Sequence, residues 1–320
     1  MRRVLLIFLK VAVSATLLYF ALSKIDLANL WSRLNADSIG WLVLAAGIIV
    51  FQIFLAAIRW REITARCDAP LTLGQAMRFN MVGTFFNQVL PSSIGGDAVR
   101  IWLVKNTGAG WRDSTYSVFV DRAIGLIALA VLIAASLPWS YRLIADVQGR
   151  IALTAVDLVA LGGGIGFLVL GQLKWPFLKR WWLTHHPYQC SVIAGQTLLS
   201  PHSGPKVALL SISIHALTAV VGWCVVQSIK APVALDQVFL LIPPVTIVTM
   251  LPIAIAGWGV RETAMMVAFG YAGLPLQDGI NVSLLFGAVT FAVGLLGGLV
   301  WILSPEKPAR SIDRASMLDA

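Results

Sequence analysis

The chain has 320 residues, of which 58% are hydrophobic and only 12% are charged. Soluble globular chains carry about 25% charged residues, so this composition excludes a soluble fold and indicates a polytopic membrane protein. The formal net charge is +9, from 24 Lys and Arg against 15 Asp and Glu. Membrane proteins keep such an excess in their cytoplasmic loops, so the charge predicts orientation in a membrane and no nucleic-acid partner.

Six apolar segments are long enough to cross the hydrocarbon core as helices, which takes about 20 residues. The first segment follows Arg2 and Arg3. It is too long for a signal peptide, is interrupted by Lys10 and ends without an A-x-A cleavage site, so we expect a retained span. In chain order, the predicted spans are Val4–Leu22, Ile39–Ile58, Ser114–Leu137, Ile151–Leu173, Val207–Ile229 and Gly279–Leu303.

Two further apolar segments, Leu73–Val104 and Leu235–Tyr271, are interrupted near their middle by Pro and Gly. Unbroken helices do not carry such residues, and non-helical backbone at membrane depth is tolerated only where protein or a water-filled cavity surrounds it. Each segment is therefore predicted to be two half-helices that form a re-entrant hairpin. The helix-breaking prolines are Pro91 and Pro252. The fold class is thus all-α, with six full spans and two broken-helix hairpins.

The stretch Lys174–Lys206 is the longest polar loop. Its tryptophans alternate with basic residues, which favours either an amphipathic segment at the membrane interface or an aromatic belt that anchors the preceding helix. Residues 305–320 are polar and predicted to be a disordered cytoplasmic tail.

The distribution of Lys and Arg predicts the topology. With a cytoplasmic N-terminus and hairpins that return to the side they enter from, seventeen Lys and Arg are cytoplasmic and six lie on the other side. This bias follows the positive-inside rule. We therefore expect a multi-pass protein of the cell inner or plasma membrane with both termini in the cytoplasm.

An internal duplication relates the two broken segments. Leu90–Arg100 and Leu251–Arg261 share six of eleven residues, and Ala69–Gln75 and Ala231–Gln237 share four of seven. The two hairpins open from opposite sides in the predicted topology, so the halves form an inverted repeat, an arrangement that places a substrate site near the midplane. We assign the repeats to residues 39–137 and 207–303 of one transmembrane domain, residues 1–304.

The broken helices predict an anion site. A half-helix N-terminus presents unpaired N–H groups and a positive dipole, glycine lets a ligand approach the backbone, and arginine adds a bidentate contact to phosphate. The residues predicted to bind the headgroup are Ser92, Ser93, Gly95, Gly96, Arg100, Gly257, Gly259 and Arg261. An alternative is that Asp97 neutralises Arg100 and Glu262 neutralises Arg261, with Pro and Gly shaping tight turns.

Other polar residues near the first break are assigned to a supporting network. Asp121 and Arg122 either lie at the membrane interface or complete the charges of the first hairpin. Asn87 and Gln88 can bind a headgroup or cap exposed backbone. His215 stands alone in an apolar span and is predicted to be packed and hydrogen-bonded. The sequence contains no enzyme or nucleotide-binding motif and no metal-ligand spacing, so we expect no catalytic residue, metal or cofactor.

Three motifs resemble those of the lysylphosphatidylglycerol synthase transmembrane region family, whose members are also described as flippase-like. The motifs are N-x-x-L-P-x-x-x-G-G-D-x-x-R at Asn87–Arg100, G-x-G-V-R-E at Gly257–Glu262, and the pair Asp121-Arg122. The resemblance covers nearly the whole chain.

The resemblance implies a role in moving or handling membrane lipids, either anionic phospholipids or polyprenyl-linked lipids. In two-domain relatives a separate cytosolic domain makes the aminoacylated lipid. We expect no aminoacyl transfer by this chain, because only about 16 residues follow the last predicted span. Two functions stay open: a lipid flippase-like transporter, and a non-transporting membrane partner of a lipid- or glycan-modifying enzyme.

Overall fold

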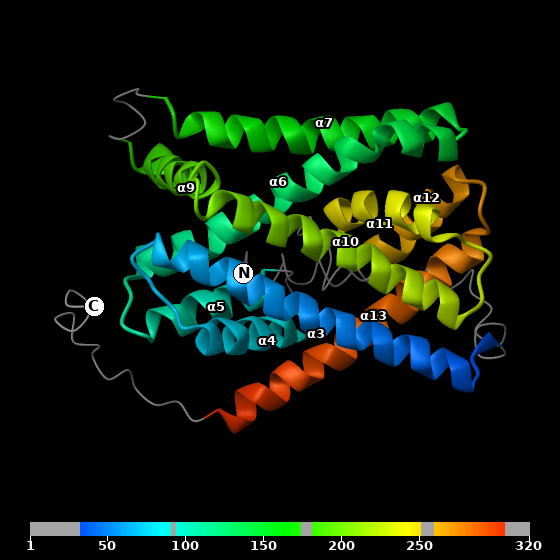
Figure 1. Cartoon of the computed structure of the whole chain (residues 1–320), viewed down its shortest axis with the longest axis horizontal. Helices are drawn as coiled ribbons and strands as arrows, with labels where there is room; N and C mark the ends of the chain where they lie inside the picture. The colour runs from blue at the N-terminus through cyan, green and yellow to red at the C-terminus, as the bar shows by residue number, and fades with distance from the viewer. Residues whose placement is uncertain (1–32, 91–93, 174–180, 251–258, 305–320) are drawn as a thin grey trace, which may run out of the picture.

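The computed structural model describes residues 33–90, 94–173, 181–250 and 259–304. Within these residues the chain forms ten helices and no strand, and the longest helices run roughly along the long axis of the molecule (Figure 1). The helices are α3 (Ala36–Ala65), α4 (Leu73–Val89), α5 (Gly95–Lys105), α6 (Trp111–Leu143), α7 (Val147–Leu170), α9 (Trp182–Leu198), α10 (Gly204–Ser228), α11 (Leu235–Met250), α12 (Val260–Tyr271) and α13 (Leu276–Leu303).

Five of these helices, α3, α6, α7, α10 and α13, are long and apolar enough to cross a membrane. They coincide with five of the six predicted spans. Each begins three or four residues before the predicted start, and α3 and α6 also end later than predicted, whereas α7 and α10 end slightly earlier. The remaining predicted span, Val4–Leu22, lies outside the described residues, as does the predicted tail 305–320.

The two interrupted segments are each divided into two helices, as predicted. Helix α4 ends at Val89 and α5 begins at Gly95, whereas α11 is described as far as Met250 and α12 begins at Val260. Figure 1 shows that α4–α5 enters and returns on the left side of the molecule, whereas α11–α12 enters and returns on the right. The two helix pairs therefore open toward opposite ends of the molecule.

The contacts between helices divide the molecule into two corresponding halves. The order α3, α4, α5, α6 in the first half matches α10, α11, α12, α13 in the second. Each helix packs on the next one in both halves, and the contact of α4 with α13 has its counterpart in that of α11 with α6. At the centre, α3 packs along α10, and Figure 1 shows the two running in opposite directions. The pattern of helix contacts is thus the same in both halves.

Each half also has its own apolar core. The largest buried side chains of the first core include Trp60 and Phe79, which pack among α3 to α6 and α9. The second core is built from α10 to α13 and includes Met265 and Phe269.

The turns that end α3 and α10 are alike in detail. Asp68 and Lys230 both have φ of 52°, in the left-handed region that non-glycine residues seldom adopt. The next N–H in each turn, from Ala69 and Ala231, donates to the carbonyl five residues earlier at 3.1 and 3.2 Å respectively. This bond is typical of helices that end in a left-handed residue.

The helices that follow these turns begin in the same way too. The Gln75 side-chain oxygen accepts the Thr72 N–H at 2.9 Å at the start of α4. The Gln237 oxygen accepts the Ala234 N–H, also at 2.9 Å, at the start of α11. These glutamines are identical in the aligned blocks, so the duplication in sequence corresponds to the same local structure in both halves.

The interpretation of Lys174–Lys206 as a loop was wrong for about half of its length, because residues 182–198 form α9. Tyr188, Cys190 and Ala194 are buried, and α9 packs against α6, α7 and α10. Contacts with these apolar helices favour helix formation in a segment whose polar residues had suggested a loop.

Candidate functional site

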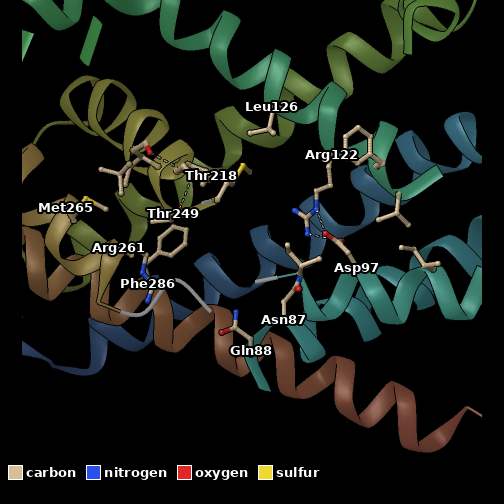
Figure 2. Close-up of a pocket in the computed structure, with 18 of the residues that line it drawn as sticks. Asn87, Gln88, Asp97, Arg122, Leu126, Thr218, Thr249, Arg261, Met265 and Phe286 are labelled. Atoms are coloured by element: carbon tan, nitrogen blue, oxygen red, sulfur yellow. Dashed lines mark hydrogen bonds and ion pairs between the residues drawn. The ribbon is translucent and has the colours of Figure 1, made fainter. Parts of the chain in front are cut away.

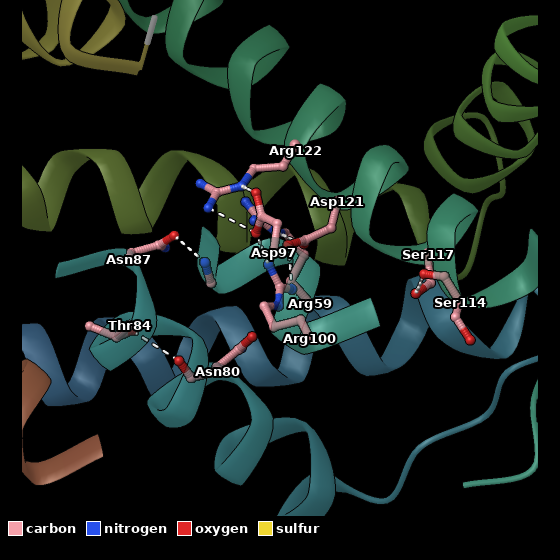
Figure 3. Close-up of polar contacts among 11 residues, drawn as sticks. Arg59, Asn80, Thr84, Asn87, Asp97, Arg100, Ser114, Ser117, Asp121 and Arg122 are labelled. Atoms are coloured by element: carbon pink, nitrogen blue, oxygen red, sulfur yellow. Dashed lines mark hydrogen bonds and ion pairs between the residues drawn. The ribbon is translucent and has the colours of Figure 1, made fainter. Parts of the chain in front are cut away.

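Helices α3, α5 and α6 bring five charged side chains together (Figure 3). Asp121 of α6 lies at the centre and is bound by two arginines from different helices. Arg59 Nε of α3 lies 2.9 Å from Asp121 Oδ1, and Arg100 Nη2 of α5 lies 3.0 Å from Oδ2. Both carboxylate oxygens of Asp121 are therefore engaged, and the ion pairs join three helices of the first half.

Asp97 joins Arg100 to Arg122. Arg100 Nη1 donates to Asp97 Oδ1 at 3.2 Å. Arg122 binds the same carboxylate with two nitrogens, Nε to Oδ2 at 2.8 Å and Nη2 to Oδ1 at 3.0 Å. Arg122 thus forms the planar two-point pair that guanidinium and carboxylate groups favour. We call Arg59, Asp97, Arg100, Asp121 and Arg122 the charge cluster.

The exposure of the cluster's side chains differs sharply. The side chains of Arg59, Arg100 and Asp121 are 9%, 7% and 5% exposed, that of Asp97 is 11% exposed, and that of Arg122 is 42% exposed. The Arg100 guanidinium also stacks 3.9 Å from the ring centre of Trp60. Arg100 is therefore held inside the protein, and Arg122 is the cluster's accessible cation.

The N-terminus of α5 is capped from α4. The Asn87 side-chain oxygen accepts the Gly96 N–H at 2.9 Å, and the N-cap residue Ile94 makes no side-chain cap. This bond is the backbone cap that was one of the two alternatives for Asn87. The predicted caps Ser92 and Ser93 lie outside the described residues, together with Pro91.

Gly95 and Gly96 are required where the chain re-enters the helix. A Cβ on Gly96 would lie 2.0 Å from the backbone oxygen of Gly83, and one on Gly95 would lie 2.6 Å from Leu90 Cβ. Both glycines permit α5 to pack closely on α4 and on Leu90, which follows it. Glycine at these positions is therefore explained without a ligand.

The second half carries a smaller network at the start of α12. Arg261 donates from Nη2 to Glu262 Oε1 at 3.1 Å and from Nε to the Ser283 hydroxyl oxygen at 3.1 Å. Glu262 is completely buried, and its Oε2 accepts the Gly259 N–H at 2.6 Å. Gly259 has φ of 84°, which favours glycine. The predicted pairing of Arg261 with Glu262 is present, whereas Pro252 and Gly257 lie outside the described residues.

Between the two halves, the described residues line a partly open cavity of about 500 Å³ (Figure 2). Arg122 and Asp97 line one side of the cavity, and Arg261 lines the other. Most of the remaining wall is apolar. It is formed by Ile94, Ile101, Val118, Phe119, Leu126, Ile242, Val245, Met250, Met265 and Phe286, with the polar residues Asn87, Gln88, Thr115, Thr218, Thr246 and Thr249.

The cavity brings together part of the predicted site. It exposes Arg261, Asn87, Gln88, Asp97 and Arg122, and it does not include Arg100. Two residues of the site were not predicted from the sequence. They are Arg59, which follows an apolar span, and Trp60, which stacks on Arg100. The available signal for Arg59 was its position directly after the predicted span Ile39–Ile58, because a charge at the end of an apolar helix that is buried in protein needs a partner.

Comparison with models of known protein families places the chain in one family. The model described as "Lysylphosphatidylglycerol synthase TM region" matches residues 7–298, nearly the whole chain. The chain belongs to this family. The match includes both broken helix pairs and the whole charge cluster. No curated protein matches the chain. The family and the five apolar helices together make this a multi-pass membrane protein.

The predicted histidine contact is also present. His215 of α10 is buried, and its Nε2 lies 2.9 Å from the carbonyl oxygen of Gly125 on α6. Within the described residues, no group of three or more His, Cys, Asp or Glu is placed to hold a metal ion.

Proposed function

We propose that this protein is a flippase-like membrane protein that binds an anionic lipid headgroup in the cavity between its two halves. The headgroup is that of an anionic phospholipid or a polyprenyl-linked lipid. The cavity wall that carries the proposal has two arginines, Arg122 and Arg261, from opposite halves, on a surface that is otherwise mostly apolar. Such a surface suits a ligand that is charged at one end and hydrocarbon at the other.

The roles of the predicted arginines follow from their exposure. Arg122 is positioned to contact a phosphate, because its side chain reaches the cavity while Asp97 fixes its orientation. Arg261 faces the same space and is held by Glu262 and Ser283. Arg100 acts behind this surface, holding Asp97 and Asp121 in place.

The arrangement of the halves supports translocation rather than simple binding. We propose that α4–α5 and α11–α12 are re-entrant hairpins in a cell membrane, opening to opposite sides, with both chain termini in the cytoplasm. A site between two oppositely oriented repeats can be exposed to each side in turn when one repeat rocks against the other. The charge cluster holds α3, α5 and α6 together, so they would move as one unit.

Reconstitution tests this function directly. Purified protein is placed in liposomes with a fluorescently labelled anionic phospholipid, and the rate at which the label becomes accessible from the outer leaflet is measured. We expect the wild-type chain to accelerate exchange and Arg122→Gln to lower the rate at least about tenfold, because the charge-assisted contact to phosphate is lost. Arg112→Gln removes the same charge from an exposed position on the same helix and is the matched control.

The outcomes separate the two candidate functions. Equal exchange by wild type and a folded Arg122→Gln variant would overturn the site assignment. Lipid that co-purifies with the wild type but is not exchanged would favour the alternative, a non-transporting membrane partner of a lipid- or glycan-modifying enzyme.

A further inference from the structure

Charge balance within the site points to the kind of anion it accepts, an inference that rests on the function proposed above. The cluster combines three guanidinium groups with two carboxylates, all joined by ion pairs between 2.8 and 3.2 Å. It therefore holds one positive charge that its own acids do not neutralise. Arg122, the most exposed member, is the place where a ligand can meet that charge.

The second half adds no net charge to the cavity. Arg261 is the only charged residue that it contributes to the described wall, and the completely buried Glu262 neutralises it at 3.1 Å. The described part of the cavity wall thus presents a single excess positive charge. Because most of the wall is apolar, charges inside it are poorly screened and an imbalance is costly.

We propose that Asp97 is a specificity-determining residue that restricts this site to headgroups with one negative charge. A phosphodiester carries one negative charge at neutral pH and balances the cluster. A diphosphate diester carries two, and the second would face the Asp97 carboxylate, which lines the cavity beside Arg122. Asp97 thereby selects against the diphosphate by repulsion as well as by leaving its second charge unpaired.

A pair of lipids that differ by one phosphoryl group tests the proposal. A polyprenyl phosphosugar and a polyprenyl diphosphosugar, with the same prenyl chain and the same sugar, compete for the purified full chain, and the bound lipid is quantified by native mass spectrometry. We expect the wild type to prefer the phosphodiester at least about tenfold. Phosphatidylglycerol, a phosphodiester with a different hydrophobic part, then shows whether the monoanion comes from a glycerolipid or from a polyprenyl lipid.

Asp97→Asn raises the excess charge of the cluster to two, so the preference should shift toward the diphosphate at least about tenfold. Asp113→Asn removes an acid from the same end of the protein, outside the described cavity wall, and should leave the preference unchanged. A folded Asp97→Asn variant with the wild-type preference would overturn the proposal.

If Asp97→Asn does not fold, the competition of the two polyprenyl lipids for the wild-type chain is the test. Binding of the diphosphosugar that is equal to or tighter than that of the phosphosugar would overturn the proposal. If the wild-type chain exchanges lipids between leaflets but does not distinguish the phosphosugar from the diphosphosugar, only this inference is overturned and the proposed function stands. A chain that neither binds nor moves any of the three lipids would overturn the proposed function itself.

Discussion

The two halves share a scaffold but differ in their charges. Equivalent turns and glutamine caps begin both helix pairs, and Arg100 and Arg261 occupy matching positions in the aligned sequences. In the first half, Arg100 is one of five charges and is buried behind Arg122. In the second half, Arg261 has one acid beside it and faces the cavity itself.

The sequence alignment shows where the halves diverged. With the offset of 161 residues that aligns Arg100 with Arg261, Asp121 corresponds to Val282, and Ser283 lies one residue further on. Ser283 makes the equivalent contact, because its hydroxyl accepts from Arg261 where Asp121 accepts from Arg100. Among the described residues, the two halves thus share the position of one arginine, and the first half holds four further charges around it where the second half holds one. We conclude that the first half sets the charge of the site and the second half completes its wall.

The largest expected effect is a loss of unfolding free energy that differs between the two halves. Asp121→Asn leaves the buried Arg59 and Arg100 without their shared partner, which should lower the free energy of unfolding by about 3–5 kcal/mol. The measurement is denaturant or thermal unfolding of the purified protein in detergent.

Glu262→Gln is the corresponding change in the second half and should cost less, about 1–3 kcal/mol. It affects one arginine, and the remaining amide oxygen can still accept a hydrogen bond from the Gly259 N–H or the Ser283 hydroxyl. Equal losses for Asp121→Asn and Glu262→Gln would show that the two halves depend equally on their ion pairs.

The sequence was sufficient to predict the five long apolar helices that the structure describes and the break between α4 and α5, because apolar length and Pro or Gly act locally. It left open whether Asp121 and Arg122 would join Asp97 and Arg100 or lie at the membrane interface. It did not show that Arg122 would be exposed and Arg100 buried, because that depends on how α5 and α6 are rotated against α3. Arg59 contributes from a third helix, a contact across 62 residues that no local pattern indicates.

The same limitation explains the error at α9. The apolar or small residues Cys190, Ile193, Ala194 and Leu198 recur at helical spacing, and this pattern was available in the sequence. The surrounding His, Gln and Ser residues masked it, because only packing against α6, α7 and α10 makes a helix of that composition stable.

A glycine substitution should have the next largest effect. Gly96→Ala places a Cβ 2.0 Å from the Gly83 backbone oxygen, so α4 and α5 must separate, at a cost of about 1–3 kcal/mol in unfolding free energy. Gly47→Ala, where nothing lies within 4 Å of the added Cβ, should be neutral or stabilising. Unfolding in detergent measures both variants.

The same experiment extends the comparison to the second half. Gly257 corresponds to Gly96 in the aligned sequences. If the second hairpin packs as the first does, Gly257→Ala should destabilise the protein to a similar extent. A loss for Gly96→Ala with none for Gly257→Ala would mean that the two breaks are packed differently.

The smallest expected effect tests what the halves retain in common. Gln75→Ala and Gln237→Ala each remove one cap on the first N–H groups of a helix, so each should cost about 1 kcal/mol of unfolding free energy. Thr72 adds a second capping bond at the start of α4, from the Gln75 N–H to its hydroxyl, and Ala234 has no side chain that can do so. Thr72→Ala should therefore leave the start of α4 with the glutamine cap alone, as at the start of α11. If Gln237→Ala has no effect while Gln75→Ala does, the matching hydrogen bonds contribute differently to stability, and the two halves have diverged in their capping as well as in their charges.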